Sequence, residues 1–206
     1  MMSQQDESLV SASDTFEIVA LAASAGGLKA LSHVLSGLPA NFPASIVVVQ
    51  HLDPRHRSLM AEILGKRTVL DVRQAQDGDT LETGVVYIAP PDHHLLVNRN
   101  GTLSLSHSEL VHFVRPSADL LFESVAASYK NRAIAVVLTG AGRDGAMGIE
   151  AVKKMGGTTI AQNETTAEHS GMPSAAIATH KVDFVLELDE IAPALITLVV
   201  KEKPND

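Results

Sequence analysis

Ser24, His51 and Asp144 are the residue types that a nucleophilic hydrolase requires, and each follows a run of apolar residues. A serine hydroxyl is a weak nucleophile at neutral pH. It therefore needs a neutral imidazole that takes its proton during attack and returns it to the leaving group. A carboxylate then fixes the imidazole tautomer and stabilises the imidazolium. The three residues predict acyl transfer through a serine nucleophile.

Each of the three residues, taken alone, has a simpler interpretation. Ser24 could cap a helix on a phosphate-binding loop, although Ala22 stands where the first glycine of the dinucleotide pattern G-x-G-x-x-G belongs. His51 could be a structural histidine, and Asp144 could belong to an ordinary Asp-Gly turn. Their joint occurrence, each at the end of an apolar run, favours the catalytic triad.

The small residues around Ser24 allow a tight turn between a strand and a helix, whose N-terminus favours negative charge. The N–H of Ala25 directly follows the nucleophile and is a natural donor to an oxyanion. One such donor typically contributes about 3 kcal/mol to transition-state stabilisation.

The elements that must position these residues follow from hydrophobic patterning. Apolar runs predict buried strands over 17–22, 45–50 and 134–139, and leucines at helical spacing predict a helix from 28 that ends at Gly37. Strand–helix–strand order implies parallel pairing with a right-handed crossover. The active residues should then gather beyond the carboxyl ends of the strands.

The rest of the chain continues this alternation. Asn100-Gly101, between 94–99 and 102–106, predicts an antiparallel hairpin. Further strands are predicted over 85–89, 158–162 and 183–188, and further helices over 58–64, 117–130, 146–155, from about 173 and from 189. The helix over 117–130 is capped by Ser117, with Leu120, Leu121 and Val125 on its buried face. We therefore expect a doubly wound, mainly parallel α/β sheet with helices on both faces and one hairpin, spanning 16–200 between flexible tails at 1–15 and 201–206.

Composition argues against several classes of partner and cofactor. A net charge of −8, scattered Lys and Arg residues, and 3% aromatic residues disfavour nucleic-acid binding. No apolar stretch approaches the roughly 20 residues of a membrane span. The absence of cysteine excludes disulfides and thiolate chemistry. Among the histidines, His51 and His56 near Asp53, and His93 and His94 after Asp92, lack metal-ligand spacing, so we expect neither metal nor cofactor.

Several motifs together resemble the catalytic domain of the chemotaxis protein-glutamate methylesterases, the CheB family. Its serine loop G-A-S-x-G-G is similar to residues 22–27, AASAGG, and its Gln-His pair to Gln50-His51. Its acidic loop L-T-G-M-G-x-D-G-A is similar to residues 138–146, LTGAGRDGA. Its R-P-S-x-D and G-M-P motifs match residues 115–119 and 171–173.

The resemblance implies that Ser24, His51 and Asp144 are catalytic, and that the substrate is the γ-methyl ester of glutamates on methyl-accepting chemoreceptor helices in the cytoplasm. Deamidation of receptor glutamines would use the same chemistry. It also points to the backbone of Ala141 as a second oxyanion donor. We further consider Arg115 a candidate for substrate positioning, or else a brace for the Ser117 helix cap.

The sequence departs from the family pattern at Ala22, Ala25 and Ala141, where glycine, threonine and methionine are usual. These changes bear on pocket shape and substrate preference more than on the reaction. Only a short segment precedes the first strand, so we expect no receiver domain in this chain. It is most similar to versions that stand alone or are fused to a receptor methyltransferase. The alternatives are a small-molecule esterase, a phosphate-binding module and a non-catalytic signalling scaffold.

Overall fold

The structure, a computed structural model, describes residues 16–51 and 58–200. Within these residues, seven parallel strands form one sheet in the order β3-β4-β2-β1-β7-β8-β9. The strands are β1 (Ile18–Ala23), β2 (Ser45–Gln50), β3 (Asp71–Gln74), β4 (Val85–Ile88), β7 (Ala133–Val137), β8 (Thr158–Gln162) and β9 (Phe184–Leu186). The predicted parallel sheet is confirmed.

The central strand β1 is buried on both faces because every one of its residues is apolar. Since successive side chains point to opposite faces, Val19 and Leu21 belong to one core cluster, and Ala20 and Ala22 belong to the other. The molecule therefore has two hydrophobic cores, one on each side of the sheet.

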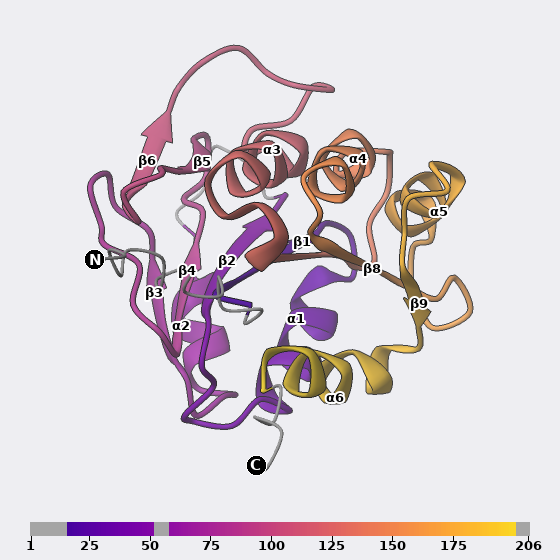
Figure 1. The fold of residues 1–206 in the computed structure, drawn as a ribbon, viewed down its shortest axis with the longest axis horizontal. Coiled ribbons are helices and arrows are strands. Elements are labelled where there is room, and N and C mark those ends of the chain that lie inside the picture. Colours follow the sequence, from indigo (N-terminus) through magenta and orange to yellow (C-terminus); the bar gives the residue numbers. More distant parts are fainter. Residues whose placement is uncertain (1–15, 52–57, 201–206) are drawn as a thin grey trace, which may run out of the picture.

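Helices cover both faces, as expected from the sequence (Figure 1). One face carries α1 (Gly27–Ser36), α2 (Met60–Gly65) and α6 (Leu188–Val199), and the other carries α3 (Ala118–Tyr129), α4 (Ala146–Lys154) and α5 (Gly171–Ala178). A short 3₁₀ turn, Lys130–Arg132, follows α3. Strands β2 and β7 lie on opposite sides of β1, and α1 and α3 lie on opposite faces, so the strand order reverses at β1, which is where α/β sheets form their binding crevice.

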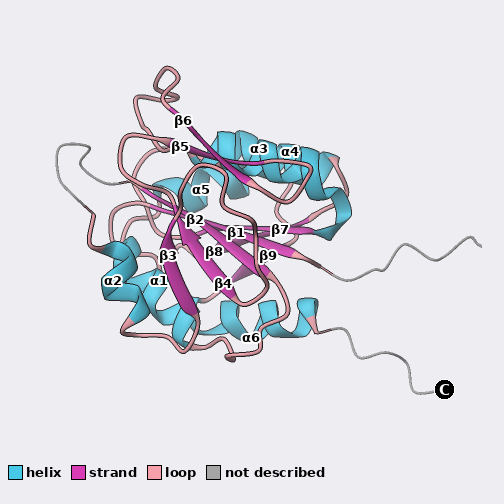
Figure 2. Cartoon of the chain, turned by 90° about the vertical axis from the view of Figure 1, so that its left-hand side faces the viewer, coloured by secondary structure: helices cyan, strands magenta, loops and turns pink. Residues whose placement is uncertain are grey.

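The predicted hairpin is confirmed as a separate two-stranded antiparallel sheet of β5 (His94–Val97) and β6 (Leu103–Ser106). Figure 2 shows it on the same side of the sheet as α3 and α4. Leu95 and Leu103 are fully buried in the core cluster that also contains Leu121 of α3. The hairpin thus extends the hydrophobic core on that face.

Some predicted boundaries differ from the structure. No sequence pattern predicts β3, because its residues DVRQ form an edge strand that is mostly exposed and lacks an apolar run. Helix α5 begins at Gly171, two residues earlier than expected, because Pro173 is tolerated in the first turn of a helix. Leu120 is half-buried and not part of the core. The predicted tails, 1–15 and 201–206, lie outside the described residues.

Candidate active site

Strand register brings the predicted site residues to one edge of the sheet. Ala23 of β1 pairs with Gln50 of β2, so Ser24 and His51 leave neighbouring strands at the same level. On the other side of β1, strand β7 pairs in parallel and leads into the turn that carries Asp144. The three residues therefore lie at the carboxyl edge, beside the point where the strand order reverses.

His51 and Asp144 are in direct contact. His51 Nε2 lies 2.8 Å from Asp144 Oδ2, and both side chains are almost fully buried, with exposed fractions of 12% and 4%. Asp144 Oδ1 accepts hydrogen bonds from the Ser117 hydroxyl and the Asp119 amide, and Oδ2 accepts one from the Ala118 amide. Asp144 thus caps the N-terminus of α3, where negative charge is favoured.

This environment keeps Asp144 ionised. Burial by itself would raise the pKa of the carboxyl, but the hydrogen bond from His51 and those from the Ala118 and Asp119 amides outweigh it. The net result is a pKa below the ordinary value of 3.8. An ionised Asp144 can orient His51 and stabilise its protonated form.

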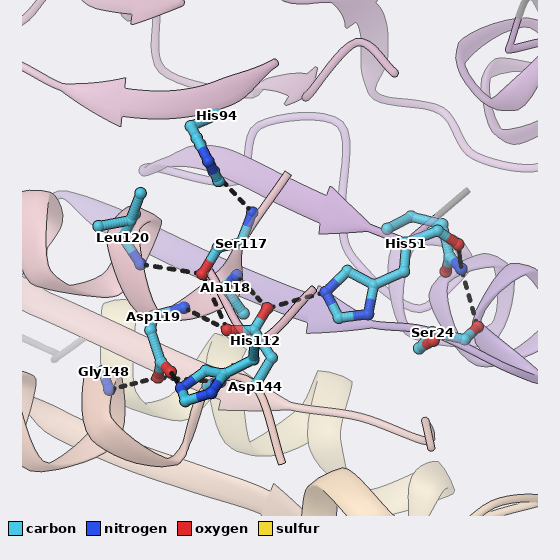
Figure 3. Close-up of polar contacts among 12 residues, drawn as sticks. Ser24, His51, His94, His112, Ser117, Ala118, Asp119, Leu120, Asp144 and Gly148 are labelled. Carbon is cyan, nitrogen blue, oxygen red and sulfur yellow. Dashed lines mark hydrogen bonds and ion pairs between the residues drawn. The ribbon is translucent and has the colours of Figure 1, made fainter. Parts of the chain in front are cut away.

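Because Asp144 occupies Nε2, the nitrogen left to act as a base is His51 Nδ1. In Figure 3 the imidazole lies between Asp144 and the loop that carries Ser24. Among the described residues, no hydrogen bond joins the Ser24 hydroxyl to His51. Catalytic contacts are often long in unliganded enzymes and tighten when substrate binds.

Gln50 holds the serine and histidine segments together, a role that sequence reasoning missed. Its Nε2 donates to the Ser24 carbonyl at 2.8 Å and to the His51 carbonyl at 3.0 Å. The side chain packs closely on Gly27, where an added Cβ would lie 1.9 Å from Gln50 Oε1. The Gln50-His51 pair of the family motif was the sequence feature that could have indicated this role.

Two glycines allow the loops around Ser24 to approach one another. Gly26 has φ +77°, a left-handed conformation that side chains disfavour, and it directs the chain from Ser24 into α1. A Cβ at Gly140 would lie 2.8 Å from the Ser24 Cβ and 2.3 Å from the Met172 sulfur. Ala141 therefore belongs to a turn that packs against Ser24. Its role as an oxyanion donor, like that of Ala25, stays a prediction.

Arg115 forms an ion pair and hydrogen bonds with residues that precede it in the chain. Its Nη2 and Nε lie 2.6 and 2.9 Å from Asp92 Oδ1, and its Nη1 donates to the carbonyls of His107 and Ser108. These contacts brace the segment that leads from the hairpin to α3. The Arg115 side chain is 13% exposed, and its role in substrate positioning stays a prediction.

Beside Ser24 is a hollow of about 390 Å³, lined by the first turn of α1 and by Gln50, Met60 and Arg67. Lys29 and Arg67 give this hollow a positive rim. Its volume lies within the range of ligand-binding pockets.

The histidines considered as metal ligands have other partners where they are described. His94 is fully buried; its Nδ1 accepts from the Ser117 amide and its Nε2 lies 3.0 Å from the Glu109 carbonyl. His56 and Asp53 lie outside the described residues. In the part of the chain that the structure describes, no group of three or more potential ligands is arranged to hold a metal ion. No helix there is long and apolar enough to cross a bilayer.

A parallel α/β sheet that gathers a serine, a histidine and an aspartate at its carboxyl edge is the arrangement of a serine hydrolase. The sequence model of the CheB methylesterase family matches residues 19–195. The chain belongs to this family.

Relatives and a solved structure agree with that assignment. A relative from Leptospira interrogans, provisionally named a protein-glutamate methylesterase/protein-glutamine glutaminase, is 40% identical and covers 89% of this chain and 95% of its own length. A Moorella thermoacetica protein named protein-glutamate methylesterase/protein-glutamine glutaminase is 42% identical. The match covers 89% of this chain and 44% of that protein. The crystal structure of the Thermotoga maritima CheB methylesterase catalytic domain has a TM-score of 0.86 at 40% identity, covering 90% of this chain and 100% of that one.

Proposed function

We propose that this chain hydrolyses the γ-methyl esters of glutamate residues on methyl-accepting chemotaxis receptors, and deamidates receptor glutamines by the same route. The reaction would take place in the cytoplasm, on receptor helices methylated by a methyltransferase in trans or fused to this chain. The observation that carries the proposal is the His51–Asp144 contact of 2.8 Å beside the Ser24 turn, in a chain of the CheB family.

In the proposed mechanism, His51 Nδ1 takes the Ser24 proton as the hydroxyl oxygen attacks the γ-carbonyl. The negative charge that develops on the carbonyl oxygen rests on the N–H groups of Ala25 and Ala141. The imidazolium, oriented by Asp144, gives its proton to the methoxy group, which leaves as methanol. Water, activated by the same imidazole, then cleaves the acyl-enzyme to glutamate and free Ser24. With a glutamine substrate the leaving group is ammonia.

The first experiment incubates the protein with a chemoreceptor fragment that carries radiolabelled methyl groups and counts released methanol. We expect the native chain to release label, and Ser24→Ala and His51→Ala each to lose about 10⁴-fold or more in rate. Ser36→Ala is the matched control, because its exposed hydroxyl on α1 donates only to the His33 carbonyl.

The outcomes separate the proposed function from its alternatives. Near-normal turnover by Ser24→Ala would remove the nucleophile assignment. Hydrolysis of a small ester such as p-nitrophenyl acetate without release from the receptor would favour a small-molecule esterase. A folded native chain that is inactive on both substrates would favour a signalling scaffold.

A further inference from the structure

A second buried carboxylate, Asp119, lies next to the triad, and the mechanism above does not use it. It is 2% exposed, in the first turn of α3. Its Oδ1 accepts hydrogen bonds from the Gly145 amide at 2.9 Å and the Gly148 amide at 2.7 Å. Both amides belong to the start of α4, directly after Asp144. Asp119 therefore ties α3 to the turn that carries the triad carboxylate.

The two carboxylates cap each other's helices. Asp144 accepts from the amides of Ala118 and Asp119 at the start of α3, while Asp119 accepts from amides at the start of α4 (Figure 3). Burial and the neighbouring Asp144 raise the pKa of Asp119 to about 6, although the Gly148 and Gly145 amides oppose this shift. Keeping both groups ionised, so close together, requires further positive charge or hydrogen-bond donors nearby.

His112 supplies such a group. Its Nε2 lies 3.3 Å from Asp119 Oδ2, a buried oxygen that has no hydrogen bond of good geometry. The imidazole projects from a tight turn closed by pairing of Val111 with Val114, in which His112 and Phe113 both have positive φ. His112 lies 3.3 Å from Asp119, and Asp144 is the charged neighbour that raises the pKa of Asp119.

We propose that His112 is a positioning residue: through Asp119 it holds the Asp144 turn in the geometry that orients His51. The proposal rests on the proposed function, because it concerns the same triad. His112 touches Asp119 and not the reacting atoms, so it acts on the chemical step through two intermediate carboxylates. Because His112 lies in the exposed turn before α3, the conformation of that turn would also affect the chemical step.

Removal of His112 should loosen the Asp144 turn. Because the imidazole lies 3.3 Å from Asp119 Oδ2, we expect Asp119 to keep its proton to a higher pH once His112 is removed, and a neutral carboxyl is a poorer acceptor for the Gly145 and Gly148 amides. His51 is then less well oriented. We expect kcat to fall about tenfold with KM unchanged, since a misplacement of 1 Å at an active site can cost about a hundredfold.

The experiment measures kcat and KM on the labelled receptor fragment for His112→Leu, His112→Gln, Asp119→Asn and the His112→Leu/Asp119→Asn double variant. The glutamine amide can still donate to Asp119, so His112→Gln should recover most of the rate. In the Asp119→Asn background, adding His112→Leu should cost nothing more. His33→Leu is the control, because it removes a histidine–carboxylate pair with Asp189 on the exposed side of α1.

A second readout does not depend on activity. In the Ser24→Ala protein, the ¹³C resonance of the Asp119 carboxyl, followed against pH, should titrate at a higher pH after His112→Leu and close to its original value after His112→Gln. If the native chain releases no methanol, the proposed function fails while this titration still tests the pair. An unchanged titration, losses that simply add in the double variant, or an effect confined to KM would each overturn the proposal.

Discussion

At the scale of single residues, Asp144 combines its proposed catalytic role with a structural one, and one substitution should affect both. Its two oxygens accept four hydrogen bonds, from His51, Ser117, Ala118 and Asp119. Asparagine offers a single acceptor oxygen. We expect Asp144→Asn to lower kcat about 10⁴-fold, because the imidazole loses its orienting charge, and to destabilise the fold by about 2–4 kcal/mol, because buried donors lose their partners.

The pH dependence of stability tests the same residue. Because the folded-state pKa of Asp144 lies below 3.8, its stabilising contribution is complete above that ordinary value and is lost as pH falls through the lower folded-state pKa. Chemical unfolding near pH 3 and pH 7 should therefore show a smaller acid-induced loss in Asp144→Asn than in the native chain.

Asp183→Asn is the matched control for Asp144→Asn, since that carboxyl also has a lowered pKa but binds Lys153 and Thr159, away from His51. It should weaken the fold without changing kcat. Equal losses of kcat in the two variants would contradict a specific role for Asp144.

At the scale of elements, the junction of β1 and α1 depends on Gly27, which has no side chain. A Cβ at Gly27 would lie 1.9 Å from Gln50 Oε1, and Gln50 bridges the carbonyls of Ser24 and His51. We expect Gly27→Ala to displace Gln50, to reduce methanol release at least tenfold, and to cost about 1–3 kcal/mol in unfolding free energy.

Gly65→Ala is the matched control for this junction. Gly65 also lies in a helix, and among the described residues its added Cβ would meet only the Val72 Cβ, at an ordinary 3.7 Å. Release of methanol and thermal unfolding, measured on both variants, separate a local effect on the site from a general loss of helix stability. Full activity of Gly27→Ala would show that Gln50 does not hold the two loops in register.

At the scale of the whole molecule, the sequence predicts what depends on local patterns and misses what depends on tertiary contacts. The mostly apolar and fully buried β1, β2 and β7 are central strands of the parallel sheet, and the sequence places Ser24 and His51 after the ends of β1 and β2. The edge strand β3 has no apolar run, so no pattern marks it. The contact of His112 with Asp119 depends on how the turn before α3 folds back, which no spacing rule describes.

Charge distribution over the whole chain leads to a further expectation about substrate binding. The net charge is −8, which repels an acidic receptor helix at long range, yet the hollow beside Ser24 carries Lys29 and Arg67. Unmethylated glutamates next to the ester would meet this positive rim. We expect Lys29→Glu to raise KM for the receptor fragment about threefold to tenfold at low salt, with little change at 1 M salt, where screening acts within about 3 Å.

Lys154→Glu makes the same change of charge on the exposed end of α4, away from the hollow, and should leave KM unchanged. Steady-state kinetics with the receptor fragment and with a small neutral ester complete the comparison. The neutral ester should not distinguish Lys29→Glu from the native chain, because it carries no charge for the rim to attract. An equal rise in KM for both lysine variants would mean that net charge alone governs the encounter, and that the rim of the hollow does not select an acidic substrate.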